Sequence, residues 1–310
     1  RRHHPTMTPK QRAVAALSLQ QPDDIVPTFE LEFQLTEELF GVPWPLSSGW
    51  GLTGAEREKA VVEYAELQVR IAERLDYSII RIYDLDVFRF LKREGYGEKF
   101  LLCGEADGTM SIPDGSSMED LACSLVEEPE EVHAKLAKDA AWAKDWGAQL
   151  AEAGAECVTM CADYCFNQGP FLSPKQFREF VFPYLADVIA SHRANGLKVI
   201  KHTDGDINPI LDQLVDANPH GLHSLDPQGH VDIAEVKRKY GQRICLCGNV
   251  NCGLLQTGTD EQVKESALYS LRHGMPGGGF IYCTSNVAFK GMELDRYLMI
   301  LDIRQEYGRY

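Results

Sequence analysis

The sequence contains no apolar run that approaches the roughly twenty residues of a membrane-spanning helix. The N-terminal stretch RRHHPTMTPKQR also lacks the apolar core of a signal peptide. Basic residues are scarce relative to acidic ones, with 31 Lys and Arg against 46 Asp and Glu, which gives a formal net charge of −15. We therefore expect a cytoplasmic protein whose main partner is neither nucleic acid nor an anionic membrane, since both are bound through Lys and Arg.

The nine cysteines show none of the paired CxxC spacings of common zinc modules, and their odd number favours reduced thiols over a disulfide framework. The three glycines at 277–279 precede an apolar run instead of following one, so they do not form a GxGxxG dinucleotide site. What the chain does have is length and apolar content: 310 residues, 44% of them hydrophobic. We predict a single domain over 1–310, with residues 1–6 a tag or a disordered start.

From residue 156 onward, a short apolar run, a polar turn and an amphipathic segment repeat. The apolar runs cover 156–163, 197–204, 221–227, 243–249 and 279–285. The helical patterns between them cover 174–196, 207–218, 232–241 and 260–274. Strands that alternate with helices need crossover connections, and this pattern indicates a parallel sheet.

The first half of the chain is less regular, with strands expected at 24–30 and 77–84 around a helix at 56–75. The segment 99–115 is expected to form a hairpin outside the core, because its turn is rich in Asp and Gly. These runs give seven barrel strands, and the weak run at 121–126 is the remaining candidate for an eighth. The sequence therefore predicts an α/β fold, a (β/α)8 TIM barrel.

In such a barrel, reactive groups lie at the carboxyl ends of the strands, where the loops meet at one mouth. His202 and Asp204 are two residues apart, so in an extended strand both side chains point to one face. Cys283 ends the last apolar run, which barrel closure brings toward the first. Together they predict a zinc site with an open position for a substrate atom, and the alternative is a histidine that orients a loop.

Two aspartates have competing interpretations. Asp206 directly precedes a helical segment, where capping of the free N–H groups explains it without a functional role. Asp84 follows an apolar run and could act as a general acid or orient a substrate, or it could cap the following helix. Asp204 can face either the pocket or its own turn, because Gly205 lets the backbone bend.

Several stretches resemble the uroporphyrinogen decarboxylase-like superfamily. The resemblance rests on MTPKQRAVAALSLQQPDDIVPTFE, CADYCFNQGPFLSPKQFREFVFPYLADVI, KHTDGDINPILDQLVDANPHGLHSLDP, CLCGNVNCGLL and PGGGFIYCTSNVAFKG. It covers nearly the whole chain and implies the barrel fold reached above. It also implies one of two reaction classes, decarboxylation of a tetrapyrrole or transfer of a methyl group to or from a corrinoid.

The decarboxylases begin with a strand of the form PVWxMRQAGR, whose arginines bind the substrate carboxylates. The equivalent stretch here is PTFELEF, with Glu30 and Glu32 where cations would be needed. An acidic wall repels a polycarboxylate, which disfavours decarboxylation. Asp84 does match the position of the pyrrole-binding aspartate, so this alternative remains.

The thiol-methylating members of the second class bind zinc through an HxC motif and a later cysteine. This chain resembles them at His202 and Cys283, but Asp204 stands where the first cysteine is expected. A harder ligand set is less suited to delivering a thiolate and better suited to activating an oxygen. This departure counts against a thiol as the methyl acceptor, and a methylcobalamin:thiol methyltransferase is kept as an alternative.

The preferred interpretation is a corrinoid-dependent methyltransferase of anaerobic one-carbon metabolism. It would move the methyl group of an aromatic methyl ether to cobalt(I) on a partner corrinoid protein, an O-demethylation in which zinc or an acid stabilises the leaving oxygen. A non-catalytic barrel is the third reading. The predicted residues are Asp84, Asp163 and Asp204 as catalytic groups; Glu30, Tyr164 and Asn286 as substrate-binding groups; and His202, Cys283 and Asp204 as metal ligands.

Overall fold

The structure is a computed structural model that describes residues 7–310, so the expected tag or disordered start at 1–6 lies outside the described residues. Seven parallel strands form one sheet in the order β1-β2-β3-β6-β7-β8-β9. Their bounds are Ile79–Arg81 (β1), Leu101–Glu105 (β2), Cys157–Met160 (β3), Lys198–His202 (β6), Gly221–His223 (β7), Cys245–Val250 (β8) and Phe280–Thr284 (β9). Each strand pairs with the next along the chain, apart from the small excursion of β4 (Cys165–Phe166) and β5 (Gly169–Pro170).

The extended segment 25–30 fills the eighth position and closes the sheet into a barrel. On one side, Tyr282 in β9 donates its backbone N–H to the Pro27 carbonyl at 3.0 Å. On the other, the backbone N–H of Ser78, just before β1, reaches the Thr28 carbonyl at 2.8 Å. Thr28 also pairs with Tyr282 in parallel. The predicted (β/α)8 barrel is confirmed.

Two details of the strand prediction were wrong. The segment 99–115 is not a hairpin outside the core, because its first part is β2, which pairs in parallel with both β1 and β3. Only the Asp- and Gly-rich residues after Glu105 form a loop. The run at 121–126 is not a strand either, since it lies within helix α6 (Met118–Glu127), where Leu125 is its one buried residue. The barrel strand missing from the seven predicted ones is therefore β2.

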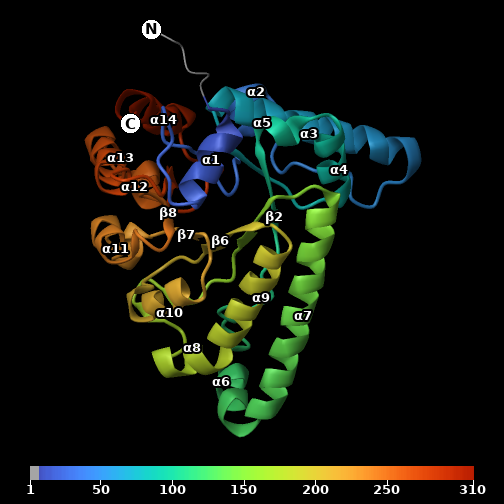
Figure 1. The fold of residues 1–310 in the computed structure, drawn as a ribbon, viewed down its shortest axis with the longest axis vertical. Helices are drawn as coiled ribbons and strands as arrows, with labels where there is room; N and C mark the ends of the chain where they lie inside the picture. Colours follow the sequence, from blue (N-terminus) through green and yellow to red (C-terminus); the bar gives the residue numbers. More distant parts are fainter. Residues whose placement is uncertain (1–6) are drawn as a thin grey trace.

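Helices surround the strands, and the long helices α7 and α9 lie side by side at one end of the molecule (Figure 1). The helices that precede β2 are α1 (Pro9–Leu17), α2 (Thr36–Phe40), α3 (Gly54–Leu75), α4 (Leu85–Arg93) and the short α5 (Tyr96–Lys99). The others are α7 (Pro129–Ala153), α8 (Pro174–Phe180), α9 (Phe182–Ala194), α10 (Leu211–Asp216), α11 (Ile233–Tyr240), α12 (Cys252–Thr257), α13 (Asp260–Gly274) and α14 (Leu294–Tyr307), with 3-10 turns η1 (Asn208–Ile210) and η2 (Pro227–Gly229).

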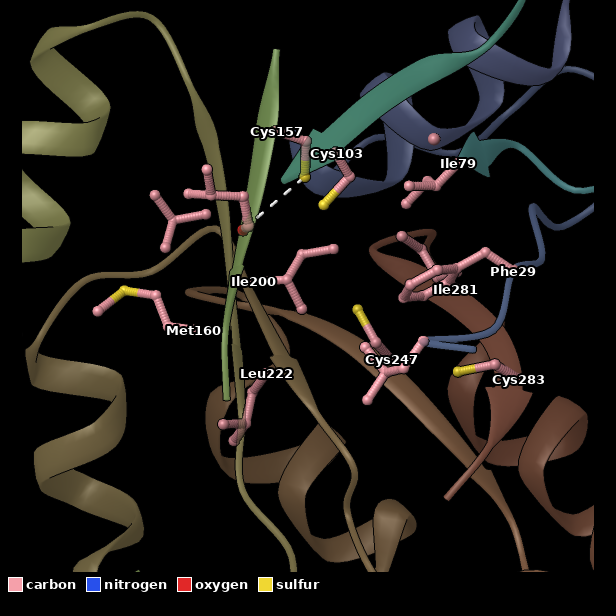
Figure 2. Close-up of a cluster of buried hydrophobic side chains, with 14 of the residues drawn as sticks. Phe29, Ile79, Cys103, Cys157, Met160, Ile200, Leu222, Cys247, Ile281 and Cys283 are labelled. Carbon is pink, nitrogen blue, oxygen red and sulfur yellow. Dashed lines mark hydrogen bonds between the residues drawn. The ribbon is translucent and has the colours of Figure 1, made fainter. Parts of the chain in front are cut away.

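The barrel interior is packed with apolar side chains and thiols. Figure 2 shows Phe29, Cys247, Ile281 and Cys283 within this cluster, and all four are at most 1% exposed. All nine cysteines are free, as expected for reduced thiols. Burial raises the pKa of the Cys283 thiol well above its usual value, so this sulfur stays protonated.

Over residues 7–310, none of the helices combines the length and the apolar character that crossing a membrane requires.

Candidate functional site

Two carboxylates and one imidazole meet where β3 and β6 end. We call Asp163, His202 and Asp204 the Asp–His–Asp group; one ligand atom from each lies within 4.8 Å of the other two. The Nε2 atom of His202 is 3.6 Å from Asp163 Oδ1 and 3.5 Å from Asp204 Oδ2. The imidazole is buried, whereas both carboxylates are partly exposed, so the group faces the outside through its oxygens.

A buried ion pair positions the loop that carries Asp163. Lys201 precedes His202 in β6, so its side chain leaves the strand on the opposite face. Its Nζ atom is 2.8 Å from Asp107 Oδ2 and donates to the carbonyls of Met160 and Ala162. The same Asp107 oxygen accepts the Ala162 N–H at 2.8 Å. Burial opposes both charges, yet the mutual attraction raises the pKa of Lys201 and lowers that of Asp107, so both are ionised.

The turn after His202 holds Asp204 against the loop. The Asp204 backbone N–H donates to Asp163 Oδ1 at 3.1 Å, which ties the two carboxylate residues together. Gly205 has φ of +80°, and a Cβ there would lie 2.6 Å from the Phe166 carbonyl, so this position requires glycine. Asp206 accepts the Asn208 N–H at 3.1 Å, the contact expected of a residue that caps a turn.

Asn286 joins the group from across the mouth. It follows β9, and its Nδ2 atom donates to Asp204 Oδ2 at 2.9 Å. The structure thus brings together four of the predicted site residues, from the ends of three different strands. These four residues are Asp163, His202, Asp204 and Asn286.

Cys283 does not join them, so its prediction as a metal ligand is revised. Its side chain points into the barrel interior with Phe29, Ile281 and Cys247 (Figure 2). The polar residue that the end of β9 contributes to the group is Asn286, three positions later. The remaining ligand set contains oxygen and nitrogen only, which is harder than the predicted one.

The contacts of Asp84 account for its capping role. It is the N-cap of α4 and accepts the Asp86 N–H at 3.0 Å. Arg57 Nη2 contacts both of its oxygens, at 2.8 and 2.7 Å, and Ser48 Oγ donates at 2.6 Å. Partial burial raises the pKa of Asp84, but these hydrogen bonds and the Arg57 guanidinium outweigh it, so the pKa is lowered overall. A carboxylate held ionised in this way is a poor general acid, and that prediction is revised.

Tyr164 is also turned away from the Asp–His–Asp group. Only 2% of it is exposed, its hydroxyl is hydrogen-bonded with Thr109, and Lys201 Nζ lies 4.4 Å from its ring centroid. It packs edge-on against Phe177. These contacts place it among the residues that support the buried ion pair, so its prediction as a substrate-binding residue is revised.

Glu30 ends the closing segment 25–30 and is buried against β9 and α14. Its carboxyl accepts from the backbone N–H of Thr284 at 3.0 Å and from Oγ1 of the same residue at 2.6 Å, with Tyr297 Oη at 3.4 Å. It borders a cavity of about 150 Å³ that none of the Asp–His–Asp group lines. Burial raises the pKa of Glu30 to about 8, against the opposing effect of these hydrogen bonds.

We expect Glu30→Gln to stabilise the protein at alkaline pH. The folded-state pKa is raised above the ordinary value of 4.5, so the stability that Glu30 contributes is fully present below pH 4.5 and is lost as the pH rises through about 8. Glutamine can accept the Thr284 N–H through Oε1 and donate to Thr284 Oγ1 through Nε2, without this titration. Since one pKa unit corresponds to about 1.4 kcal/mol, the gain at pH 8.5 should be about 2 kcal/mol or more.

Urea denaturation of both proteins at pH 5 and pH 8.5 measures this effect. Glu63→Gln, at an exposed position of α3, is the matched control and should show a small difference that does not change with pH. A Glu30→Gln effect of equal size at both pH values would contradict the assignment of a protonated, buried carboxyl.

Two residues of the mouth were missed as site residues by the sequence analysis. Arg81 ends β1 two residues after the inward-facing Ile79, and strand alternation alone could have indicated that it also points inward. Its five N–H groups are all used, by Thr159 Oγ1, the Leu31 carbonyl, the Tyr83 hydroxyl, Glu105 Oε2 and Cys161 Sγ. It therefore has no free donor to offer a ligand.

His223 is the second missed residue, and it lies directly behind His202. The two Nδ1 atoms are 2.7 Å apart. Burial, followed by the charges of His202 and Arg81, lowers the pKa of His223 well below its ordinary value. A neutral His223 is the consequence. Its parallel register with His202 was not readable from the sequence, because it depends on how β6 and β7 pair.

The Asp–His–Asp group fits a divalent metal ion. Two carboxylates and an imidazole are ligands that zinc and other first-row divalent ions accept. The distances from His202 Nε2 to the two carboxylates exceed those of ordinary N–H···O hydrogen bonds, so this nitrogen is not committed to either of them. Each carboxylate has another hydrogen-bond donor, since Asn286 Nδ2 donates to Asp204 Oδ2 and the Asp204 backbone N–H donates to Asp163 Oδ1.

Comparison with solved structures agrees with the barrel fold. A methyltransferase from Methanosarcina mazei superimposes with a TM-score of 0.74 at 18% identity, covering 97% of this chain and 99% of that one. A B12-independent methionine synthase from Shewanella sp. W3-18-1 gives a TM-score of 0.51 at 10% identity, covering 92% and 97%. At these identities the likeness shows the fold alone.

The curated relatives align over smaller shares of both chains. The uroporphyrinogen decarboxylase of Chlorobaculum tepidum is 26% identical over 199 residues, 61% of this chain and 54% of its own. That of Pelodictyon phaeoclathratiforme is 23% identical over 241 residues, 74% and 66%. The chain spans about half of the length of the curated relatives it matches. The family model described as Uroporphyrinogen decarboxylase (URO-D) matches residues 109–307, and the chain therefore belongs to the uroporphyrinogen decarboxylase family.

Proposed function

We propose that this protein transfers the methyl group of an aromatic methyl ether to cobalt(I) of a corrinoid on a partner protein. The observation that carries the proposal is the Asp–His–Asp group at the barrel mouth, an oxygen and nitrogen donor set without a thiolate. Such a set suits activation of an ether oxygen better than delivery of a sulfur. The M. mazei protein that shares the fold is itself described as a methyltransferase.

The reaction breaks the bond between oxygen and the methyl carbon and forms one between carbon and cobalt. The cobalt(I) electron pair makes the new bond, the oxygen keeps the pair of the old one, and the product oxygen takes a proton. Asp163 and Asp204 lie closest to the outside and are the groups that could orient the ether or, when no metal is bound, deliver this proton. The His202 imidazole lies on their buried side, with Nε2 3.6 Å from Asp163 Oδ1 and 3.5 Å from Asp204 Oδ2.

Zinc would be held by Asp163, His202 and Asp204, and when bound it supplies a Lewis acid that stabilises negative charge on oxygen. The protein's own contribution is the placement of these three side chains. Asp204 is held by Asn286 and by the Asp163 carboxylate, and Asp163 stands on the loop fixed by Lys201. The group is thus preorganised before a substrate arrives.

Decarboxylation of a tetrapyrrole is the second candidate, favoured by the family and by the names of the curated relatives. Two structural observations weigh against it. Arg81 has all its N–H groups engaged within the protein, so it cannot clamp acetate groups. The accessible groups at the mouth include the carboxylates of Asp163 and Asp204, which repel a polycarboxylate. Glu30 no longer contributes to this argument, because it is buried.

Metal analysis and a cobalamin assay test the proposal. We expect purified protein incubated with zinc to retain one equivalent, and to convert free cob(I)alamin to methylcobalamin when given 2-methoxyphenol or a related ether. The colour change of the corrinoid measures the transfer. If no methylcobalamin forms across a panel of aromatic and alkyl methyl ethers, the proposal is wrong.

Two further arms separate the alternatives. Loss of carboxylates from uroporphyrinogen, measured by chromatography of the oxidised porphyrins, would assign the protein to the decarboxylases. Demethylation of methylcobalamin by a thiol, without activity on ethers, would assign it to the thiol methyltransferases.

A further inference from the structure

Two histidines at the barrel mouth form a buried, hydrogen-bonded pair. His202 in β6 and His223 in β7 are paired in register on neighbouring strands, and they are 4% and 0% exposed. Their Nδ1 atoms are 2.7 Å apart and their ring centroids 4.9 Å apart. The edge of His223 also packs against Phe29, with 6.1 Å between centroids, which restricts its rotation.

A hydrogen bond between two Nδ1 atoms needs one proton, carried by one of the rings. If His223 Nδ1 carries it, neutral His202 must be protonated on Nε2 and present an N–H to the two carboxylates. If His202 Nδ1 carries it, the Nε2 lone pair faces Asp163 and Asp204. Only the second arrangement leaves His202 able to bind a cation, because a metal takes the lone pair of a neutral imidazole.

The surroundings of the outer nitrogens favour the second arrangement. His202 Nε2 lies 3.5 Å or more from both carboxylates, longer than an N–H donor prefers. On the other ring, His223 Nε2 is buried, and among residues 7–310 it has no hydrogen-bond partner of standard geometry; the backbone of Thr284 is the polar group beside it. A proton on this nitrogen can be directed at the Thr284 carbonyl.

We infer that His223 is a positioning residue, which accepts a hydrogen bond from His202 Nδ1–H and so holds the His202 Nε2 lone pair toward Asp163 and Asp204. The inference rests on the metal site of the proposed function. It does not depend on which methyl donor is used. Partners of this kind typically change metal affinity about 10- to 100-fold when they are removed.

Two substitutions at one position test the role of the acceptor. His223→Leu keeps a bulky side chain but removes the hydrogen-bond acceptor. We expect zinc to bind about 10- to 100-fold more weakly to this variant, measured by competition with a chromophoric chelator. His223→Asn places Oδ1 close to the position of Nδ1 and keeps an acceptor, so its zinc affinity should stay within about threefold of the wild type. Similar losses in both variants would overturn the inference.

His192→Leu is the matched control for loss of a buried histidine. His192 is fully buried in α9, its Nε2 lies 2.7 Å from the Ala106 carbonyl, and it is not a member of the Asp–His–Asp group. We expect this variant to melt at a lower temperature without a change in zinc affinity. A fall in zinc affinity equal to that of His223→Leu would show that general destabilisation is responsible, and would overturn the inference.

The tautomers themselves give a measurement without metal or substrate. Long-range 1H–15N correlation of histidine-labelled protein should show His202 protonated on Nδ1 and His223 on Nε2. The opposite pattern overturns the inference even if the protein transfers methyl groups. Conversely, the expected tautomers and zinc affinities in a protein that never methylates cobalamin would leave the inference standing and reject the proposed function.

Discussion

Replacing His202 with alanine is expected to abolish zinc binding and methyl transfer while leaving the barrel folded. The imidazole is the one nitrogen ligand of the Asp–His–Asp group, and without it two partly exposed carboxylates remain. Loss of a primary ligand should weaken zinc binding by more than the 10- to 100-fold typical of outer partners, so we expect a fall of about 1,000-fold or more. Chelator competition measures the affinity and the cobalamin assay measures the transfer.

Asp206→Asn is the matched control within the same HTDGD segment. Asp206 caps the turn at Asn208 and is not part of the group, so its loss should leave zinc affinity unchanged. Circular dichroism establishes whether each variant is folded. If folded His202→Ala binds zinc as tightly as the wild type, the metal lies elsewhere and the proposed function loses the observation that carries it.

The barrel was predictable because its signal is repeated. From residue 156 onward, every apolar run expected as a strand contains one, and the carboxyl ends of those strands carry the group. β2 was missed because its five residues run directly into an Asp- and Gly-rich loop, which reads locally as a hairpin. Its identity as a strand depends on pairing with β1 and β3, which is information beyond the local pattern.

The site was predictable where strand alternation decides it. His202 and Asp204 are two residues apart, and their side chains do lie together, with 3.5 Å between His202 Nε2 and Asp204 Oδ2. The same rule misled at the end of β9, since nothing in the sequence says whether Cys283 or Asn286 stands at the level of the mouth. That level is set by the stagger of β9 against β8, where Asn249 pairs with Cys283.

Buried charges are the part that the sequence conceals most completely. Lys201 stands between Ile200 and His202 in an apolar run, and its partner Asp107 is 94 positions away along the chain. No local pattern indicates that the two side chains meet, or that the loop before Asp163 is tied to them. The support beneath the site comes from long-range contacts, and only the structure reveals it.

Lys201→Met is expected to cause the largest loss of stability among the substitutions considered. It leaves the Asp107 carboxylate buried at 7% exposure without its cation, and removing one partner of a buried ion pair typically costs about 3–5 kcal/mol. The carbonyls of Met160 and Ala162 lose their shared donor at the same time. Since these bonds fix the loop that carries Asp163, zinc affinity should fall as well, and denaturant unfolding and chelator competition measure the two effects.

The same substitution at an exposed pair separates burial from charge. Lys144→Met removes an ion pair with Asp187 of 2.7 Å, close to the 2.8 Å between Lys201 and Asp107. Both of its side chains are at least 36% exposed, so the loss of stability should be within about 1 kcal/mol. The double variant Lys201→Met with Asp107→Leu should recover much of the lost stability, because it leaves no unpaired charge in the interior. Zinc affinity should nevertheless stay low in the double variant, since Ala162 and its loop remain without their anchor. Recovery of both properties would mean that the ion pair stabilises the barrel without positioning Asp163.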